Sequence, residues 1–516
     1  MVAATVDSPL SQTLQFTLDR LRQLNTQDIQ THWQLHQGDL PIETIFNSAQ
    51  RTQQNWPTAI LNDRQHISWE KGLNVLWLYQ ELVAPDNRKG YPLAGLTLRI
   101  ALTWWASGAL SYVDGQLIQS GDLFECFTRI CLSSHVTPGQ IFRVGIRLES
   151  PGHDDGALVR SQQIYELPEN HPTPEPSFVA DELNVLAILE PKAQTEIESA
   201  AAQLNWESLE VISTQSSTND ALNIWQDFST QTVSIPAITH PFQQSLSQLR
   251  RNLKHHSPQL KSRQIQCVGH AHLDMAWLWP ISDTWKAAER TFKSILNLQK
   301  DFSELTYTHS SPALFEWIEN NKPELFKQIQ QKVKEGSWSI DAGLWIEPEL
   351  NIIGGEAIAR QILYGQRYCQ EKFGTLSTIA WLPDSFGFCW QLPQLLIQGG
   401  IKTFATLKLS WNDTTEFPHS LFWWQSPDGS RILSLMLPPI GTDIDPVKMA
   451  NHATQWETST GISNTLWLPG LGDHGGGPTR DMLEKANRLK NSPFFPKINF
   501  TNPKNYIQAL PKTELP

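Results

Sequence analysis

From Ile265 onward, short apolar runs typical of β-strands alternate with stretches of helical character. The helical pattern is clearest over Trp285–Gln299 and Lys322–Lys334. Consecutive parallel strands need a long crossover, usually a helix, so this alternation favours a parallel α/β architecture, either an open sheet or a barrel. In such folds, side chains at the carboxyl ends of the strands surround a common crevice and carry the chemistry. The strand-like runs cover residues 265–272, 304–310, 378–384, 403–410, 431–437 and 464–470.

The preceding half of the chain has a different pattern, in which short apolar runs follow one another without helices between them. Asp114-Gly115 and Pro138-Gly139 supply turn chemistry between such runs. Several strands at this spacing predict a β-sandwich over residues 70–165. The residues before it, 1–69, have apolar positions near helical spacing and predict a helical segment. The predicted strands are Thr97–Trp105, Gly108–Val113, Leu123–Leu132 and Gln140–Leu148.

A proline-rich stretch separates these two regions. Four prolines fall within residues 166–177, where they remove backbone donors and favour an extended chain. Residues 166–262 are therefore predicted to form a linker and a helical bridge, with an amphipathic helix over Phe242–Leu253. A chain of 516 residues is too long for one ordinary core. We expect a multi-domain protein whose α/β domain covers residues 263–516.

Charge and composition argue against several function classes. The chain has 40 Lys+Arg against 52 Asp+Glu, a net charge of −12, whereas nucleic-acid binding needs a basic field. No apolar run of about 18 residues predicts a membrane span, and the N-terminus lacks the basic and apolar regions of a signal peptide. The five cysteines are odd in number and lack CxxC spacing. We therefore expect a cytoplasmic protein without disulfides or a thiolate metal site.

The first polar strand end contains His270, His272 and Asp274, in VGHAHLDMAWLWP. Alternate side chains of an extended segment project to one face, so these three are expected to point together. Two imidazoles and a carboxylate form half of a divalent-metal site, for which Zn²⁺ is the expected ion. The alternative is that the histidines satisfy buried backbone groups or cap the next helix.

Two further strand ends carry acidic residues. Asp384, in TIAWLPDSFGFCWQLP, is expected at the mouth of a pocket with aromatic walls, as a ligand, base or nucleophile. Its alternative role is to cap the following helix. Asp473 and His474 precede three glycines in GLGDHGGGPT, where the backbone can approach a ligand closely. A tight structural turn is the alternative for that loop.

Weaker candidates lie outside these motifs. Asp341, Glu347 and Glu349, in SIDAGLWIEPELN, either line a polar pocket or are solvated loop charges. Asp443 and Asp445 end another apolar run and are candidates either for a second catalytic acid or for turn residues beside a proline. His255 and His256 lie in a basic helical stretch and are expected to face solvent.

Together, HAHLDMAW, AWLPDSFGF and GDHGGGPT resemble the motifs of glycoside hydrolase family 38, the retaining class II α-mannosidases, in particular its cytosolic and bacterial branch. The resemblance covers residues 265–516 and implies an α/β barrel of seven parallel strands with one zinc ion. It implies that terminal α-mannosides of oligosaccharides or glycosides are the substrate. It implies that His272, Asp274 and Asp384 bind zinc, that Asp384 is the nucleophile and Asp443 the acid/base, and that Trp277, Phe386 and Asp473 bind the sugar.

The mechanism implied by this resemblance is double displacement. Asp384 attacks the anomeric carbon to give a mannosyl ester while an acid protonates the leaving oxygen, and water then reverses the step with retention of configuration. The resemblance implies that zinc binds two sugar hydroxyls, O2 and O3, and does not activate water as hydroxide.

The sequence departs from the family pattern at one point. Family members carry a further zinc-ligand histidine downstream of the nucleophile, in an H-D-x-x-P-G-like motif after a helical bundle. This sequence ends at Pro516 without that motif. We expect a truncated chain, a split gene whose separate chain carries the missing part, or a degenerate product. Zinc would then be held by three protein ligands and water.

Two other functions stay open at this point. An amidohydrolase- or deacetylase-like enzyme also begins with H-x-H or H-x-D on an early strand, but it needs further histidines at later strand ends. His309 is the later histidine that fits best. The second alternative is a carbohydrate-binding fragment that holds no zinc and has no activity.

Overall fold

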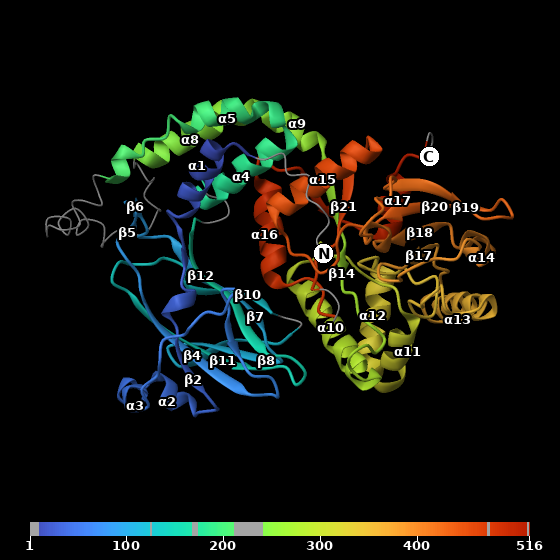
Figure 1. The fold of residues 1–516 in the computed structure, drawn as a ribbon, viewed down its shortest axis with the longest axis horizontal. Coiled ribbons are helices and arrows are strands. Elements are labelled where there is room, and N and C mark those ends of the chain that lie inside the picture. Colours follow the sequence, from blue (N-terminus) through green and yellow to red (C-terminus); the bar gives the residue numbers. More distant parts are fainter. Residues whose placement is uncertain (1–9, 124–125, 168–173, 211–240, 472–474, 513–514) are drawn as a thin grey trace. The chain divides into compact units, whose positions relative to one another are not determined.

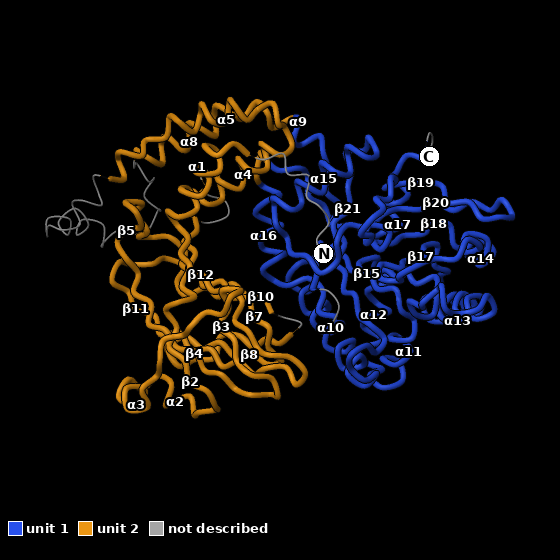
Figure 2. Tube along the Cα trace, in the orientation of Figure 1, with its two compact units in different colours: residues 1–7, 259–491, 495–516 blue, residues 8–258, 492–494 orange. Residues whose placement is uncertain are grey.

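The computed structural model describes residues 10–123, 126–167, 174–210, 241–471, 475–512 and 515–516 (Figure 1). The chain divides into two compact units (Figure 2). The N-terminal unit takes its described residues from 8–258 and 492–494, and the C-terminal unit from 259–491 and 495–516. The fold is mixed α/β, with antiparallel sheets in the first unit and small, mainly parallel sheets in the second. None of the described helices is long and apolar enough to cross a membrane.

Two five-stranded antiparallel sheets form the β-rich part of the N-terminal unit. The first sheet contains β1 (Thr26–Asp28), β3 (Ile67–Trp69), β7 (Thr97–Trp105), β10 (Phe127–Ser133) and β12 (Gly156–Glu166). The second contains β2 (Gln34–Gln37), β4 (Val75–Val83), β8 (Gly108–Val113), β9 (Gln116–Gly121) and β11 (Ile141–Glu149). A separate two-stranded sheet pairs β5 (Asn87–Arg88) with β6 (Tyr91–Pro92). From β7 to β12 the chain passes repeatedly between the two sheets, as it does in sandwich folds.

The Asp114-Gly115 turn accounts for one of these pairings. Asp114 has φ 49° and Gly115 has φ 83°. Two successive residues in the left-handed region form the turn whose twist matches that of the flanking strands. This turn joins β8 to β9 as an antiparallel hairpin. The strands predicted over Thr97–Trp105 and Gly108–Val113 have these same bounds in the structure.

Residues 1–69 contain more strand than their sequence pattern indicates. Helices α1 (Gln12–Arg22), α2 (Ile42–Phe46) and α3 (Ser48–Gln53) lie here, but so do β1, β2 and β3. Each of these strands has only three or four residues, too few to establish an alternating pattern. They pair with β12 or β4, so long-range pairing decides their conformation.

Helices follow the two sheets in the chain. Of the prolines predicted to form a linker, Pro168 and Pro172 lie outside the described residues, and Pro176 begins a helix. Proline is well tolerated there because the first N–H groups of a helix have no helical partner. The predicted amphipathic helix buries Phe242 and Leu246, one turn apart. The elements are α4 (Pro176–Leu189), α5 (Gln194–Ala201), α8 (Pro241–Leu253) and α9 (Ser257–Ser262), with 3-10 turns η1 (Gln30–His32), η2 (Pro191–Ala193) and η5 (Lys254–His256).

Three small sheets organise the C-terminal unit, and all strand pairs in them are parallel except the pair of β19 with β20. The first sheet has the order β21 (Asn464–Trp467), β13 (Gln264–Cys267), β22 (Lys497–Phe500). The second has β14 (Gly269–His270), β15 (Tyr307–His309), β16 (Trp338–Ile340), and the third has β17 (Ile379–Trp381), β18 (Thr403–Thr406), β20 (Arg431–Met436), β19 (Leu421–Gln425).

The expected barrel of seven parallel strands is therefore not one closed sheet in the described part of the chain. The first two sheets touch through single hydrogen bonds, as where the His270 N–H at the end of β14 donates to the Pro469 carbonyl just after β21. Between β20 and β21 the structure has only an isolated bridge from Thr442 to Pro469. Proline has no N–H to donate, so the ladder cannot continue through it. The described strands of this unit thus form three sheets and not one closed barrel.

Helices follow most of these strands, as the sequence pattern predicts, but none separates β13 from β14 or β19 from β20. The core between them is apolar and includes Val268, Ile379 and Leu433, each almost fully buried. The elements are α10 (Ile281–Asp301), α11 (Pro312–Asn321), α12 (Pro323–Glu335), α13 (Gly355–Phe373), α14 (Leu392–Gln398), α15 (Pro446–Thr460), α16 (Arg480–Asn491) and α17 (Pro503–Ala509), with the 3-10 turn η6 (Lys408–Ser410).

One buried histidine in this unit makes stability depend on pH. His452, on α15, lies against Trp467, with ring centroids 5.7 Å apart. Burial disfavours its charged form and lowers the pKa of His452 to about 4, from 6.5 in a solvated histidine. The unfolded chain therefore binds more protons than the folded chain between these values, so stability falls as pH decreases from about 6.5 towards 4.

We predict that titration of His452 removes about 3 kcal/mol of unfolding free energy over this window. The His452→Gln variant should lose that part of the pH dependence, whatever its stability at pH 7. Urea unfolding at several pH values between 7 and 4 measures it. His135→Gln, which replaces an exposed histidine, is the matched control and should keep the wild-type slope. Equal slopes for His452→Gln and wild type would contradict the prediction.

Candidate active site

The first site segment follows β14. His272 lies two residues beyond the end of this strand, and its Nε2 is 3.1 Å from Asp274 Oδ1. His270, the last residue of the strand, points elsewhere, because its Nδ1 lies 3.4 Å from the Thr308 carbonyl oxygen and its ring packs against Trp381. The expectation that His270 joins the other two is therefore wrong. The strand ends at His270, so the alternation of side chains does not extend past it.

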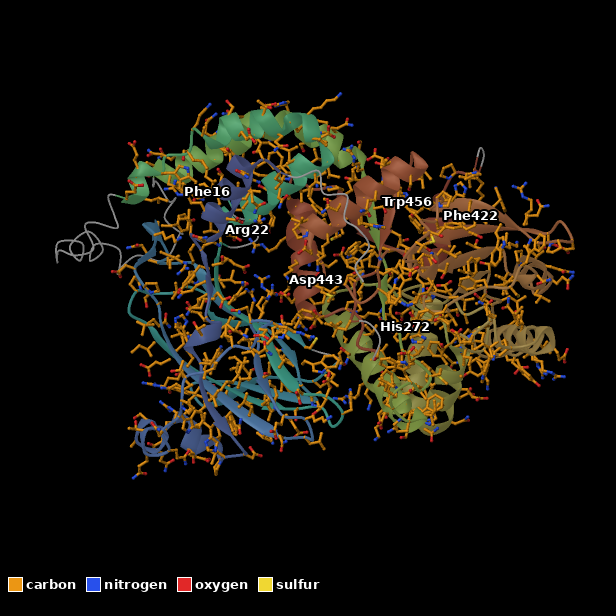
Figure 3. All side chains as sticks on the ribbon, viewed as in Figure 1. Phe16, Arg22, His272, Phe422, Asp443 and Trp456 are labelled. Atoms are coloured by element: carbon orange, nitrogen blue, oxygen red, sulfur yellow. The ribbon has the colours of Figure 1, made fainter. Side chains whose placement is uncertain are left out.

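The second site segment follows β17 and brings Asp384 to the same place. Asp384 Oδ2 is 3.4 Å from His272 Nε2. One ligand atom from each of His272, Asp274 and Asp384 lies within 4.8 Å of the other two. Asp274 and Asp384 are about 110 residues apart in the chain, so the fold alone joins them. Figure 3 labels His272, which lies within the C-terminal unit.

Glu347 contacts both site segments, the one after β14 and the one after β17. The backbone N–H groups of Asp384 and Ser385 both donate to Glu347 Oε1, the second at 2.8 Å. Its other oxygen, Oε2, lies 3.7 Å from His272 Nδ1. Burial is the largest influence on this carboxyl group and raises the pKa of Glu347 to about 7. The loop after β16 thus fixes the backbone of Asp384 and faces the rear nitrogen of His272.

A lysine that the sequence analysis did not select completes the cluster. Lys408 follows β18, and its Nζ forms an ion pair with Asp384 Oδ1. The Lys408 side chain is only 4% exposed. Its Nζ lies 3.2 Å from the ring centroid of Trp411 and 4.1 Å from that of Phe386. A lysine within the apolar run TFATLKLS is the signal that could have identified it, since lysine is almost never buried without a partner.

The charges in this cluster favour a cation. Burial is the largest influence on His272 and favours its neutral ring. The hydrogen bonds to Asp274 and Asp384 and the charge of Glu347 outweigh it, however, and raise the pKa of His272 to about 10. Partial burial of Asp384 favours its neutral form, but His272 and Lys408 together lower the pKa of that carboxyl. Three acidic side chains thus surround one imidazole, and within the described ranges a single lysine ammonium pairs with them.

The donor set fits a divalent metal ion. An imidazole nitrogen and two carboxylate oxygens within 4.8 Å of one another are the ligand types that zinc accepts. A metal-binding histidine usually has a carboxylate or carbonyl partner at its other ring nitrogen, which fixes the ring. Glu347 lies at that nitrogen of His272. The residues therefore fit the cofactor that the family resemblance implies.

The other predicted site residues are placed differently. Trp277 and Phe386 are exposed, and Phe386 packs edge-on against Trp411 with centroids 6.0 Å apart. Asp443 Oδ1 lies 3.5 Å from Lys448 Nζ, and among the described residues no hydrogen bond or ion pair joins it to the cluster. Asp473 lies outside the described residues.

The chain has measurable similarity to known proteins. Residues 262–514 match the family model described as Glycosyl hydrolases family 38 N-terminal domain. Alpha-mannosidase G of Dictyostelium discoideum is 35% identical over 258 residues, which are 49% of this chain and 24% of that protein. Alpha-mannosidase 2C1 of Homo sapiens is 35% identical over 249 residues, 48% of this chain and 24% of that protein.

The alpha-mannosidase of Saccharomyces cerevisiae is 39% identical over 228 residues, which are 43% of this chain and 21% of that protein. The chain therefore matches between about a fifth and a quarter of the length of these curated relatives.

Proposed function

Residues 262–514 belong to glycoside hydrolase family 38, and from this membership we propose that the chain is a zinc-dependent retaining α-mannosidase with Asp384 as its nucleophile. The observation that carries the proposal is the meeting of His272, Asp274 and Asp384 within 4.8 Å. We further propose residues 263–516 as the catalytic domain and residues 70–165 as its accompanying β-domain. All five cysteines are free, which supports a reducing, cytoplasmic environment.

The metal-binding residues of this proposal are His272, Asp274 and Asp384. Bound zinc would supply positive charge that orients the sugar hydroxyls and stabilises negative charge on their oxygens. Glu347 keeps the His272 ring in place from behind, and it also positions the backbone at Asp384. One carboxylate would then serve both as ligand and as nucleophile.

Lys408 prepares Asp384 for the first chemical step. Its ammonium group pairs with Asp384 Oδ1 and, together with His272, lowers the pKa of this carboxyl group. An Asp384 oxygen attacks the anomeric carbon, the bond from that carbon to the leaving oxygen breaks, and a general acid gives its proton to the leaving oxygen. The product is a mannosyl ester of Asp384.

The second step reverses the first with water. The conjugate base of the same acid takes a proton from water, the water oxygen attacks the anomeric carbon, and the Asp384 carboxylate leaves. Two inversions give retention of configuration. Asp443 is the carboxyl group that we propose for the acid/base role, on the family resemblance. Phe386 and Trp277 would line the sugar site as exposed aromatic faces, and Asp473 would bind a sugar hydroxyl.

A direct test compares two substrates with and without a chelator. We expect the purified chain to hydrolyse a chromogenic α-mannoside, to lose this activity after chelation and to regain it with Zn²⁺. Hydrolysis of an N-acetyl or amide substrate in its place would favour the amidohydrolase reading. The geometry gives that reading little support, because buried His309 Nδ1 accepts from the Ser311 N–H and the ring lies outside the metal cluster. Absence of both zinc and turnover would favour an inert fragment.

Trp277 gives a second test of the sugar site. Its side chain is 62% exposed, so its replacement should leave the core intact. Stacking of a sugar face on an indole is worth about 1 to 1.5 kcal/mol, by analogy with aromatic pairs. We predict that Trp277→Ala raises KM for the α-mannoside about tenfold and leaves Tm unchanged. Trp390→Ala is the matched control, since Trp390 is 65% exposed in the same unit. A large fall in Tm with unchanged KM would instead make Trp277 a packing residue.

A further inference from the structure

The N-terminal unit contains a second cluster of ligand-type side chains, formed by Glu196 on α5 and by His255 and His256 in η5. One ligand atom from each of the three lies within 4.8 Å of the other two. We propose that this cluster is a binding site for a divalent transition-metal ion of the Zn²⁺ type. The proposal concerns a different unit from the catalytic cluster and does not depend on the function proposed for it.

The carboxylate of Glu196 faces the Nε2 atoms of both rings. His256 Nε2 is 3.1 Å from Glu196 Oε2, and His255 Nε2 is 3.4 Å from Glu196 Oε1. Each carboxylate oxygen therefore faces the same nitrogen of a different imidazole. The glutamate and the histidines are about 60 residues apart in the chain, and the packing of α5 beside α8 brings them together.

The backbone settles which nitrogen of His255 carries hydrogen. His255 Nδ1 lies 3.0 Å from the carbonyl oxygen of Asn252, which can only accept. Nδ1 must therefore donate, and in the neutral ring Nε2 carries a lone pair. That lone pair faces a carboxylate oxygen, so two acceptors oppose each other. A cation between them turns this repulsion into coordination, and a backbone carbonyl at the other nitrogen is the usual support of a metal-binding histidine.

Protonation of both rings is a poor substitute for a shared cation. The ring centroids of His255 and His256 are 4.1 Å apart, so two imidazolium ions would repel each other beside one carboxylate. A single metal ion would bind the His255 lone pair and Glu196 at once, and His256 Nε2, 3.1 Å from Glu196 Oε2, lies within reach of the same ion. Two imidazoles and one carboxylate suit zinc, nickel or copper better than calcium or magnesium. His255 is 59% exposed and Glu196 is 46% exposed, which leaves room for water to complete the coordination.

The experiment uses the full chain with the catalytic cluster disabled by His272→Ala and Asp384→Ala, so that only the second cluster can bind. After chelation and dialysis, this background protein is titrated with Co²⁺, followed by visible absorption, and then with Zn²⁺ in competition. We expect one equivalent of metal and a Co²⁺ absorption band. Adding His255→Ala with His256→Ala should abolish both. Glu196→Gln should weaken binding about tenfold or more, since loss even of an outer partner of a ligand costs that much.

His135→Ala, which removes an exposed histidine of the same unit, is the control and should bind like the background protein. Of the substituted side chains, His255, Glu196 and His135 are exposed and His256 is 18% exposed, and circular dichroism without metal should confirm an unchanged fold. A metal-dependent rise in Tm that disappears with His255→Ala and His256→Ala would independently support the site. A background protein that binds no metal would overturn the proposal, as would binding that is unaffected by loss of both histidines.

Discussion

Replacing Asp384 by asparagine should lower kcat for an aryl α-mannoside by about 10⁴-fold or more, as loss of a nucleophile does in other covalent mechanisms. Asparagine has the shape of aspartate but no charge, so it cannot form the mannosyl ester. The backbone of residue 384 would still be fixed by Glu347, because this contact uses only backbone N–H groups. The fold should therefore persist, and circular dichroism and Tm measure that separately from turnover.

Two measurements make the Asp384 prediction specific. Asp413→Asn, which neutralises an exposed carboxylate in the same unit, should leave kcat within about twofold of wild type, as surface changes usually do. An activated fluoro-mannoside that forms the ester but hydrolyses slowly should label wild type, and peptide mass spectrometry should place the label on Asp384. A label on another carboxylate, or turnover retained in Asp384→Asn, would contradict the assignment of Asp384 as the nucleophile.

The second large effect is expected at Lys408. Methionine keeps the length and apolar stem of lysine but removes the ammonium group that pairs with Asp384. We predict a loss of about 10² to 10³-fold in kcat for Lys408→Met, comparable to removal of one charge-stabilising donor in other enzymes. KM should change much less, because Lys408 is buried and acts on the sugar only through Asp384.

Matched variants separate this positioning role from simple packing. Lys402→Met, six residues earlier and exposed, should have wild-type kcat and Tm. Lys408→Arg keeps the charge beside Trp411 and Phe386 and should recover part of kcat. The Asp384 pKa should rise in Lys408→Met, so the acidic limb of the pH–rate profile should move to higher pH. If only Tm fell in Lys408→Met and both kcat and the profile stayed unchanged, the ion pair would be structural alone.

The sequence predicts those parts of the site that lie directly after strands. His272 and Asp274 follow β14, and Asp384 follows β17, so the rule that chemistry gathers at the carboxyl ends of parallel strands selects all three, although the two strands belong to different sheets. The same reasoning failed for His270, because a two-residue strand ends before the alternation can be extended. The strand itself was predicted correctly, but the error at His270 came from where the strand ends.

The supporting residues were harder to recognise from the sequence. Glu347 lies in a loop without helical or strand periodicity, so no pattern indicates that its carboxylate reaches the backbone of Asp384. Lys408 looks like one polar position in an apolar run, and only the fold supplies its partner. In the N-terminal unit, the edge strands β1 and β2 likewise depend on partners far along the chain. What local sequence cannot encode is the identity of a distant neighbour.

The pairing of β13 has a consequence for how the chain is made. Gln264 at its start pairs with Asn464 of β21 and with Lys497 of β22, which are translated about 200 and 230 residues later. At about 5 to 20 residues per second, this central strand waits tens of seconds on the ribosome before either neighbour exists. During that interval Ile265 and Cys267, which are buried in the folded unit, lack the two strands that flank β13. Biogenesis of the C-terminal unit should therefore depend on chaperones more than its final stability suggests.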